Sequence, residues 1–202
     1  ETGLGNLEKQ IENIQMFGLP VVVALNEFPT DTSAEVAFIE ERCRKQGAQM
    51  AISRAWSQGG AGNIDLAHKV VAATKRPNNF HFLYQLDSPL KDKIKVICQS
   101  VYGAERVNYS KEAEQMINRF EEMGYGHLPI CMAKTQYSLS DNPELKGRPQ
   151  NFSITIREVR LCAGAGFIVA FTGSIMTMPG LGKHPSAENI DILPDGRIVG
   201  LF

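Results

Sequence analysis

The sequence has no long apolar run and no marked net charge, and each absence excludes a class of protein. No apolar stretch approaches the ~20 residues of a membrane-spanning helix. The 21 basic and 22 acidic residues leave a net charge of −1, so no overall charge attracts nucleic acid or an anionic membrane. We therefore expect small molecules or other proteins as partners, and neither nucleic acid nor membrane.

Cysteine and histidine are few and scattered. No CxxC pair and no HExxH spacing occurs, so we expect free thiols in a reducing compartment, no structural metal and no tightly bound cofactor. The four cysteines are Cys43, Cys98, Cys131 and Cys162.

Motifs for phosphate binding and nucleophilic catalysis are also missing. Neither GxGxxG nor GxxxxGK[ST] is present. The run Gly59-Gly60-Ala61-Gly62 precedes a helical pattern and would offer backbone N–H groups to an anion, but such glycines also form ordinary turns. Nothing resembles a Ser-His-Asp or Cys-His arrangement, and no carboxylate pair stands out for acid–base work. No catalytic residue is predicted in this chain.

Helical and strand patterns alternate along the first two thirds of the chain. Leu4, Leu7, Ile11 and Ile14 recur at three- and four-residue steps, as on one face of a helix. The Val-rich run 19–25 is typical of a strand covered on both faces. We expect helices over 4–17, 32–44, 64–75, 88–101 and 112–124, and strands over 19–25, 49–53, 80–86, 106–109 and 128–133. Residues 1–138 are thus predicted to form an α/β domain with a mostly parallel sheet and helices on both faces.

The pattern changes from about Leu139 onward. A stretch rich in Pro, Gly, Ser and Asn leads into residues 152–157, which alternate with period two like a half-exposed strand. Residues 167–171 indicate a buried strand, and residues 190–199 a hairpin around an Asp-Gly turn. We expect residues 139–202 to form a small β-rich C-terminal lobe. On the helix expected over 88–101, Lys91, Lys93 and Lys95 are expected to face solvent.

Two loops combine an aromatic residue with a position directly after a strand. Phe28 with Pro29 follows the strand expected over 19–25, and Trp56, the only Trp, follows the strand expected over 49–53. Ligands of open α/β sheets bind at the carboxyl ends of the strands. Two rings placed there would clamp a flat ligand. The alternative, that both rings only cover the core, stays open at this point.

Two further segments have two interpretations each. Lys134-Thr135-Gln136-Tyr137-Ser138 follows a strand and is either a polar site or an ordinary strand exit, which we favour. The loop 177–182 either lines a pocket or only turns the chain.

Several motifs follow one another along the chain. They are Phe28-Pro29-Thr30-Asp31-Thr32, Trp56 with its Gly-rich loop, Met132 to Ser138, Gly147-Arg148-Pro149 with Asn151-Phe152, Met176 to Leu181, and Asn189-Ile190-Asp191 to Phe202. Taken together and in order, they resemble the C-terminal portion of formate–tetrahydrofolate ligase (formyltetrahydrofolate synthetase). The resemblance spans essentially the whole chain.

The resemblance implies an ATP-dependent ligase of one-carbon metabolism that makes 10-formyltetrahydrofolate. ATP (with Mg) phosphorylates formate, and tetrahydrofolate attacks the formyl phosphate. Phe28, Pro29 and Trp56 match the family's folate-stacking positions. For the adenine end of the nucleotide, the candidates that the resemblance suggests are Arg148, Pro149, Pro179, Gly180 and Leu181. It also implies a cytoplasmic enzyme that is a homo-oligomer when complete.

One departure affects the mechanism. The family's P-loop, with its phosphate-binding lysine, lies in an N-terminal part that has no counterpart in these 202 residues. The chain also starts at Glu1 rather than Met, so we interpret it as part of a longer polypeptide that is inactive alone and needs the P-loop part as a partner. Gly182 stands where relatives commonly have Pro. The alternative function is a non-catalytic binding or assembly module that retains the ligase fold.

Overall fold

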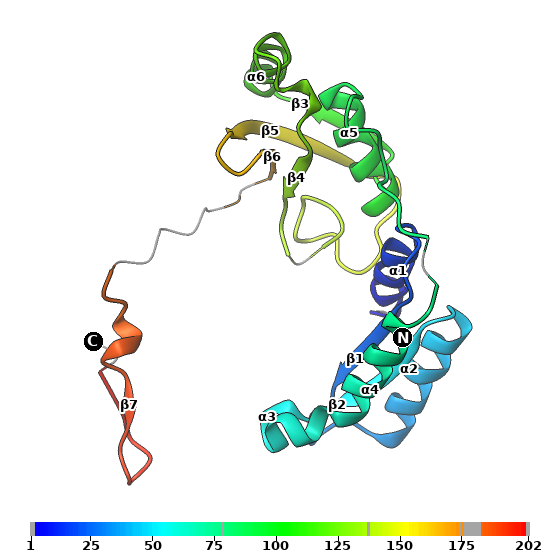
Figure 1. Ribbon diagram of the computed structural model, residues 1–202, viewed down its shortest axis with the longest axis vertical. Helices are drawn as coiled ribbons and strands as arrows, with labels where there is room; N and C mark the ends of the chain where they lie inside the picture. Colours follow the sequence, from blue (N-terminus) through cyan, green and yellow to red (C-terminus); the bar gives the residue numbers. More distant parts are fainter. Residues whose placement is uncertain (1–2, 78, 137, 174, 176–182, 201–202) are drawn as a thin grey trace.

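Two sheets with their helices make up most of the molecule. The computed structural model describes residues 3–77, 79–136, 138–173, 175 and 183–200. In Figure 1 the two sheets lie at opposite ends of the main body, with α1 between them. We call them the β1–β2 unit and the mixed-sheet unit.

The β1–β2 unit contains the first seven elements of the chain. They are α1 (Leu4–Gln15), β1 (Val22–Asn26), α2 (Ser33–Lys45), β2 (Gln49–Ser53), α3 (Ala55–Gln58), the 3-10 helix η1 (Gly59–Asn63) and α4 (Ile64–Thr74). The two strands are parallel, with Val22 opposite Gln49 and Asn26 opposite Ser53. A two-stranded parallel sheet covered by helices agrees with the α/β fold predicted for this region.

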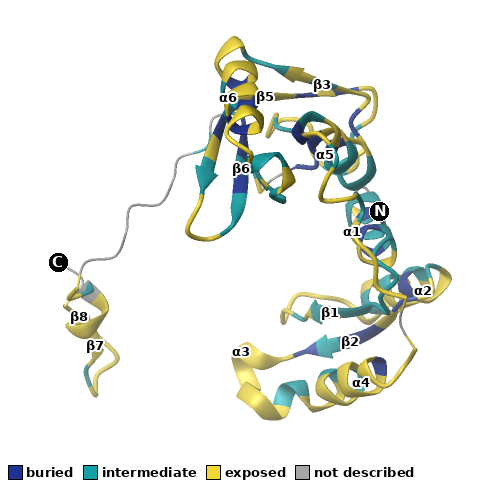
Figure 2. Ribbon diagram, turned by 45° about the horizontal axis from the view of Figure 1, so that its top comes forward, coloured by how far each residue is buried: buried dark blue, intermediate teal, exposed yellow. Residues whose placement is uncertain are grey.

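Alternate residues of β1 face different helices. Val23 and Leu25 pack on the cluster that Ile11 of α1 and Cys43 of α2 form. Val22 lines a hollow with residues of α4 instead. Helices therefore cover both faces of this sheet, as its apolar strands predict (Figure 2).

The N-terminus of α2 is fixed by a complete capping box. The Thr32 side chain accepts a hydrogen bond from the Glu35 N–H, and the Glu35 carboxylate accepts one from the Thr32 N–H. Reciprocal bonds of this kind satisfy two of the free N–H groups at a helix start. The helix therefore begins directly after the loop that carries Phe28.

The mixed-sheet unit has four strands in the order β3-β5-β6-β4. Its elements are α5 (Leu90–Val96), the π-helical turn η2 (Ile97–Val101), β3 (Arg106–Tyr109), α6 (Lys111–Glu122), the 3-10 helix η3 (Tyr125–His127), β4 (Ile130–Ala133), β5 (Ser153–Cys162) and β6 (Phe167–Thr172). The pairs β3–β5 and β4–β6 are parallel, and β5–β6 is antiparallel. Strands from both sides of residue 138 thus share one sheet.

The strands expected after residue 139 are confirmed. β5 alternates between exposed and buried positions over most of its length, as the period-two pattern predicts. β6 is largely buried. The expected hairpin is also present: β7 (Asp191–Ile192) pairs antiparallel with β8 (Ile198–Val199), and Gly196 in the turn has a φ of +83°. Only glycine adopts such a backbone at little cost.

The strand expected over residues 80–86 is wrong, since no strand is assigned within that segment. Its aromatic residues pack on each other and on the end of α1 instead: the Phe80 and Phe82 ring centroids lie 5.3 Å apart, and Phe17 stacks on Phe80 at 6.4 Å. The His81 N–H donates to the Phe17 carbonyl. Ring packing therefore accounts for the apolar pattern that was interpreted as a strand.

The solvent-facing position expected for Lys93 is also wrong. This side chain is fully buried, and its ammonium donates to the carbonyls of Gly126 (2.6 Å) and Leu128 (3.0 Å). Those carbonyls belong to η3 and to the residue after it, so Lys93 of α5 satisfies hydrogen-bond acceptors at the end of η3. Sequence periodicity on α5 alone does not reveal acceptors that come from another element.

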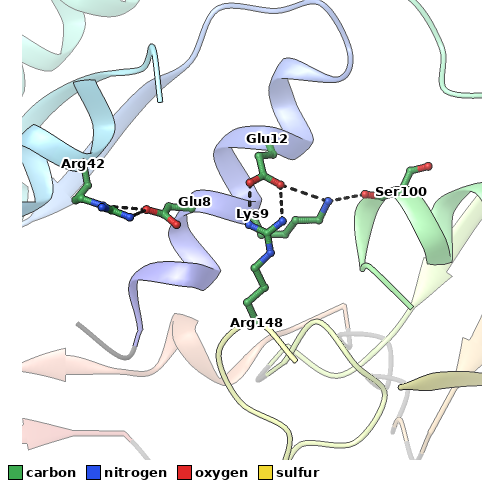
Figure 3. Close-up of polar contacts among 6 residues, drawn as sticks. All are labelled: Glu8, Lys9, Glu12, Arg42, Ser100 and Arg148. Atoms are coloured by element: carbon green, nitrogen blue, oxygen red, sulfur yellow. Dashed lines mark hydrogen bonds and ion pairs between the residues drawn. The ribbon is translucent and has the colours of Figure 1, made fainter. Parts of the chain in front are cut away.

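Helix α1 connects the two units through its charged side chains (Figure 3). The Lys9 ammonium donates to the Ser100 carbonyl at 2.6 Å, and the Arg148 guanidinium donates to both carboxylate oxygens of Glu12, at 2.7 and 2.8 Å. On the side of the β1–β2 unit, Arg42 of α2 pairs with Glu8. Side chains of α1 thus bond to both units.

All four cysteines are free thiols, as expected, but their burial differs. Cys43 and Cys98 are buried, Cys162 is half-buried, and Cys131 is exposed although it lies in β4. Burial raises the pKa of the Cys98 thiol to about 12. Within the described ranges, no helix is both long and apolar enough to cross a membrane.

Candidate functional site

The two aromatic loops lie side by side because β1 and β2 are parallel neighbours. β1 ends at Asn26 and β2 at Ser53, and these two residues are paired in the ladder. The Glu27 N–H then donates to the Ser53 carbonyl at 3.1 Å, which extends the pairing by one residue. Loops 27–32 and 54–63 therefore leave the same edge of the sheet, where ligands of α/β proteins bind.

The first loop is a tight turn that holds Phe28 outward. The Phe28 N–H donates to the Asp31 carboxylate at 2.8 Å, and the Asp31 N–H donates to the Phe28 carbonyl at 3.0 Å. Pro29 in the same turn is exposed and restricts the backbone further. The Phe28 side chain remains 59% exposed.

The second loop holds Trp56 on the one-turn helix α3. The indole N–H of Trp56 donates to the Glu27 carbonyl at 2.9 Å, and the side chain is 64% exposed. The loop closes where the Arg54 N–H donates to the Gly62 carbonyl at 3.2 Å. A Cβ at Gly62 would lie 2.6 Å from the Arg54 carbonyl oxygen, so this glycine is required for the close approach.

These exposures favour a binding role over the alternative in which the rings only cover the core. A ring that acts as a lid loses most of its accessible surface, whereas Phe28 and Trp56 keep more than half of theirs. Neither ring stacks on another aromatic side chain in the part of the chain that the structure describes. Two large apolar rings thus stand at one sheet edge with free faces.

A pair of opposite charges joins the two loops. The Arg54 guanidinium donates to both carboxylate oxygens of Glu27, with Nη2 at 3.1 Å from Oε1. This hydrogen bond from Arg54 holds the pKa of Glu27 below its ordinary value. Glu27 is therefore ionised at neutral pH.

Two hollows flank this edge. One, of about 510 Å³, is lined by Phe28, Asp31 and Glu35 together with apolar residues of α1, β1 and α2. The other, of about 380 Å³, lies beside the second loop and is lined by Arg54, Lys69 and other polar side chains together with apolar residues of β2 and α4. Volumes of this size are typical of small-molecule sites.

The lysine that lines the second hollow already has hydrogen-bond partners within the chain. The Lys69 ammonium donates to the Met50 carbonyl at 2.7 Å and to the Asp65 carboxylate at 2.8 Å. Cations that are paired in this way contribute little net charge to the hollow.

The residues expected at the nucleotide lie elsewhere. Arg148 sits against α1, where its bonds to Glu12 lower the pKa of that carboxyl. Pro149 next to it is half-buried. Pro179, Gly180 and Leu181 fall outside the described residues. The structure therefore brings Phe28, Pro29 and Trp56 together at one edge, and places Arg148 at the junction of the two units.

Lys134 stabilises the loop that follows β4. Its ammonium donates to the backbone carbonyls of Thr135 (2.7 Å), Ser138 and Ser140 (3.3 Å). Burial lowers the pKa of this amine. The lysine thus holds its own loop in place, in agreement with the interpretation favoured from sequence.

Sequence reasoning assigned no role to Glu27 or Arg54. A usable signal was present, because Glu27 and Arg54 are opposite charges that each come directly after one of two successive strands. Parallel pairing places such positions next to each other. Which charged side chains meet there depends on the register of the two strands, which a single sequence does not show.

Comparison with known families gives one match, and it covers the whole chain. Residues 1–202 match the family model described as formate–tetrahydrofolate ligase. No group of three or more His, Cys, Asp or Glu side chains suited to a metal occurs among the residues that the structure describes.

Proposed function

The chain belongs to the formate–tetrahydrofolate ligase family, and from this premise we propose that its part in the ligase reaction is to hold the tetrahydrofolate acceptor between Phe28 and Trp56. The observation that carries the proposal is the pair of exposed rings at adjacent strand ends: Phe28 is held by a bond within its own loop, and the Trp56 indole is bonded to Glu27 of the neighbouring loop. Pro29 stiffens the Phe28 turn and belongs to the same site.

The reaction needs an acceptor that is oriented and shielded from water. Formyl phosphate, made from formate and the terminal phosphate of ATP, is attacked by an amine nitrogen of tetrahydrofolate, and phosphate leaves. A pterin-like ring stacked on Phe28 and Trp56 would gain about 0.5–1.5 kcal/mol per aromatic contact beyond burial. Its amine would then be presented to the formyl carbon from a defined direction.

We assign the phosphate chemistry to residues outside this chain. Phosphoryl transfer depends on groups that surround the phosphates, and the 202 residues contain no P-loop motif. The chain alone is therefore expected to be inactive, and the N-terminal part of the family's enzyme to complete the site with ATP and its Mg. Formation of 10-formyltetrahydrofolate by this chain alone would contradict the assignment, while activity only after addition of the separately produced N-terminal part would support it.

The adenine end of ATP is assigned to Arg148 and Pro149, with Pro179, Gly180 and Leu181. This assignment rests on the resemblance, and it requires Arg148 to exchange or share its bonds to Glu12. A homo-oligomeric enzyme in a reducing, cytoplasmic compartment completes the proposal, in keeping with four free thiols.

Binding of tetrahydrofolate to the chain provides the direct test. Because Trp56 is the only Trp, its emission reports on the site without labels. We expect tetrahydrofolate to quench this emission, and we expect Trp56→Ala and Phe28→Ala to weaken binding, measured by calorimetry, by at least about fivefold.

Phe82→Ala is the matched control. Phe82 is 67% exposed but lies outside both loops, so its loss should leave the affinity unchanged. If tetrahydrofolate neither quenches Trp56 nor binds more weakly to the two loop variants, the stacking site is wrong. A non-catalytic module would then be the better description.

A further inference from the structure

We propose that Glu27 and Arg54 are positioning residues that set the spacing between the Phe28 and Trp56 rings. The inference rests on the proposed function for its consequence on folate, but its structural part is testable without any ligand. Neither side chain is assigned contact with the substrate.

In the described part of the chain, Glu27 supplies every polar tie from the first loop to β2 and the second loop. Its N–H donates to the Ser53 carbonyl at 3.1 Å, its carbonyl accepts from the Trp56 indole at 2.9 Å, and its carboxylate accepts two hydrogen bonds from Arg54. Glu27 directly precedes Phe28 in the first loop and is bonded to the Trp56 ring of the second loop. A single residue therefore connects the two rings.

The rings need such ties because packing does not hold them. Phe28 and Trp56 are 59% and 64% exposed, and α3 has only four residues. A single helical turn has little stability of its own. The strand ends fix the backbone up to Asn26 and Ser53. Beyond them the Arg54–Gly62 bond closes the second loop, and the bond to Glu27 ties the Trp56 indole to the first loop.

A paired Arg and carboxylate suits this role because its geometry is specific. Two parallel N–H···O bonds fix the direction as well as the distance between the groups. The Arg54 and Glu27 side chains are 45% and 25% exposed. An ion pair with this exposure adds little to folding stability, so we expect its loss to affect the site more than the fold.

The matched control is a second Glu–Arg pair of the same type. On β5, the Arg160 guanidinium donates to both carboxylate oxygens of Glu158, in the mixed-sheet unit and away from the aromatic loops. Glu158→Gln therefore removes an equivalent exposed pair without touching the loops.

The first measurement uses the ligand-free chain. In Glu27→Gln and in Arg54→Gln, we expect acrylamide to quench Trp56 more strongly and its fluorescence anisotropy to fall, while the urea midpoint stays that of wild type. The charge-reversed double variant Glu27→Arg/Arg54→Glu should restore both signals, and Glu158→Gln should change neither.

The second measurement uses tetrahydrofolate. We expect Glu27→Gln to raise the Kd about three- to tenfold, the range for the net loss of a single hydrogen bond, and the double variant to recover most of the affinity. In the enzyme assembled with its N-terminal part, the KM for tetrahydrofolate should rise while kcat is unchanged.

The outcomes separate this proposal from the proposed function. Unchanged Trp56 quenching and anisotropy in both single variants would overturn the positioning role, whatever the chain binds. A lowered urea midpoint that the double variant does not restore would show a structural role and would also overturn it. If wild type fails to bind tetrahydrofolate, the proposed function fails, and the ligand-free measurement still decides whether Glu27 and Arg54 position the ring.

Discussion

The two units differ in how much of their apolar surface they bury. The mixed-sheet unit has a continuous core through α5, α6, β5 and β6, whereas the buried cluster of the β1–β2 unit is small in the part of the chain that is described. The members of the smaller cluster are Ile11, Cys43, Ala48 and Met50. The aromatic site lies on the unit with the smaller core. In the proposed function, the mixed-sheet unit is the scaffold, and the β1–β2 unit keeps apolar groups free for a ligand.

The exposed residues of the β1–β2 unit support this division. Besides Phe28 and Trp56, this unit exposes three apolar residues of α4. They are Ile64, Val70 and Val71, which are all between 44% and 57% exposed. In the mixed-sheet unit, side chains of the same kind on α6, such as Ile117 and Phe120, are buried. Burial of apolar surface drives folding, so the difference predicts where substitutions will affect stability and where they will affect binding.

The largest effect on the free energy of unfolding is expected from a substitution in the core of the mixed-sheet unit. Ile154 of β5 is fully buried, so Ile154→Ala should lower the free energy of unfolding by about 2–5 kcal/mol. Trp56→Ala should change it by less than about 0.5 kcal/mol, as for other exposed positions. Urea unfolding followed by circular dichroism measures both. Equal losses would mean that the site and the scaffold share one core.

A second prediction concerns the buried cation of the scaffold. Lys93→Met keeps the side-chain volume but leaves the carbonyls of Gly126 and Leu128 without their donor, so we expect a loss of about 1–3 kcal/mol in the free energy of unfolding. Lys95→Met on the same helix is the control, because Lys95 is exposed. A loss of the same size at both positions would show that helix propensity, rather than the buried bonds, is responsible.

The mixed-sheet unit should also determine the response to high pH. Burial raises the pKa of Tyr102 to about 12, while in the unfolded chain it ionises near 10. A raised folded-state pKa gives stability that is complete below pH 10 and is lost as the pH rises toward 12. Tyr102 should therefore contribute a loss of about 1.4 kcal/mol by pH 11.

Tyr102→Phe tests this assignment. Unfolding free energies measured from pH 8 to pH 11 should fall less steeply in the variant than in wild type. Part of the slope will remain, since the pKa of Cys98 is also raised. Identical slopes in the two proteins would rule out Tyr102 as a source of the alkaline loss.

The smallest effect is expected at the junction between the units. The Glu12 and Arg148 side chains are 33% and 38% exposed, so a double-mutant cycle with Glu12→Gln and Arg148→Gln should give a coupling of about 0.2–1 kcal/mol. Neither change should alter the Kd for tetrahydrofolate, because the aromatic loops are held by other bonds. A change in that Kd would show that α1 couples the two units.

Local patterns in the sequence predicted most of the elements correctly. The period-two alternation of residues 152–157 became β5, and the helix expected over 32–44 became α2. The segment 80–86 was mispredicted because its aromatic residues pack on Phe17 and not in a sheet. Such packing depends on which surface the fold brings near, and local periodicity carries no information about it.

By itself, the sequence determined that this chain belongs to an α/β family and that two aromatic loops follow successive strands. Both conclusions depend only on neighbouring residues and on the order of the motifs, and a single sequence shows both. Only the tertiary structure decided that Phe28 and Trp56 stand exposed, that Glu27 and Arg54 join their loops, and that Arg148 pairs with Glu12 of α1. Those facts depend on contacts between residues 27 to 136 positions apart, which form only when the strands pair and the helices pack.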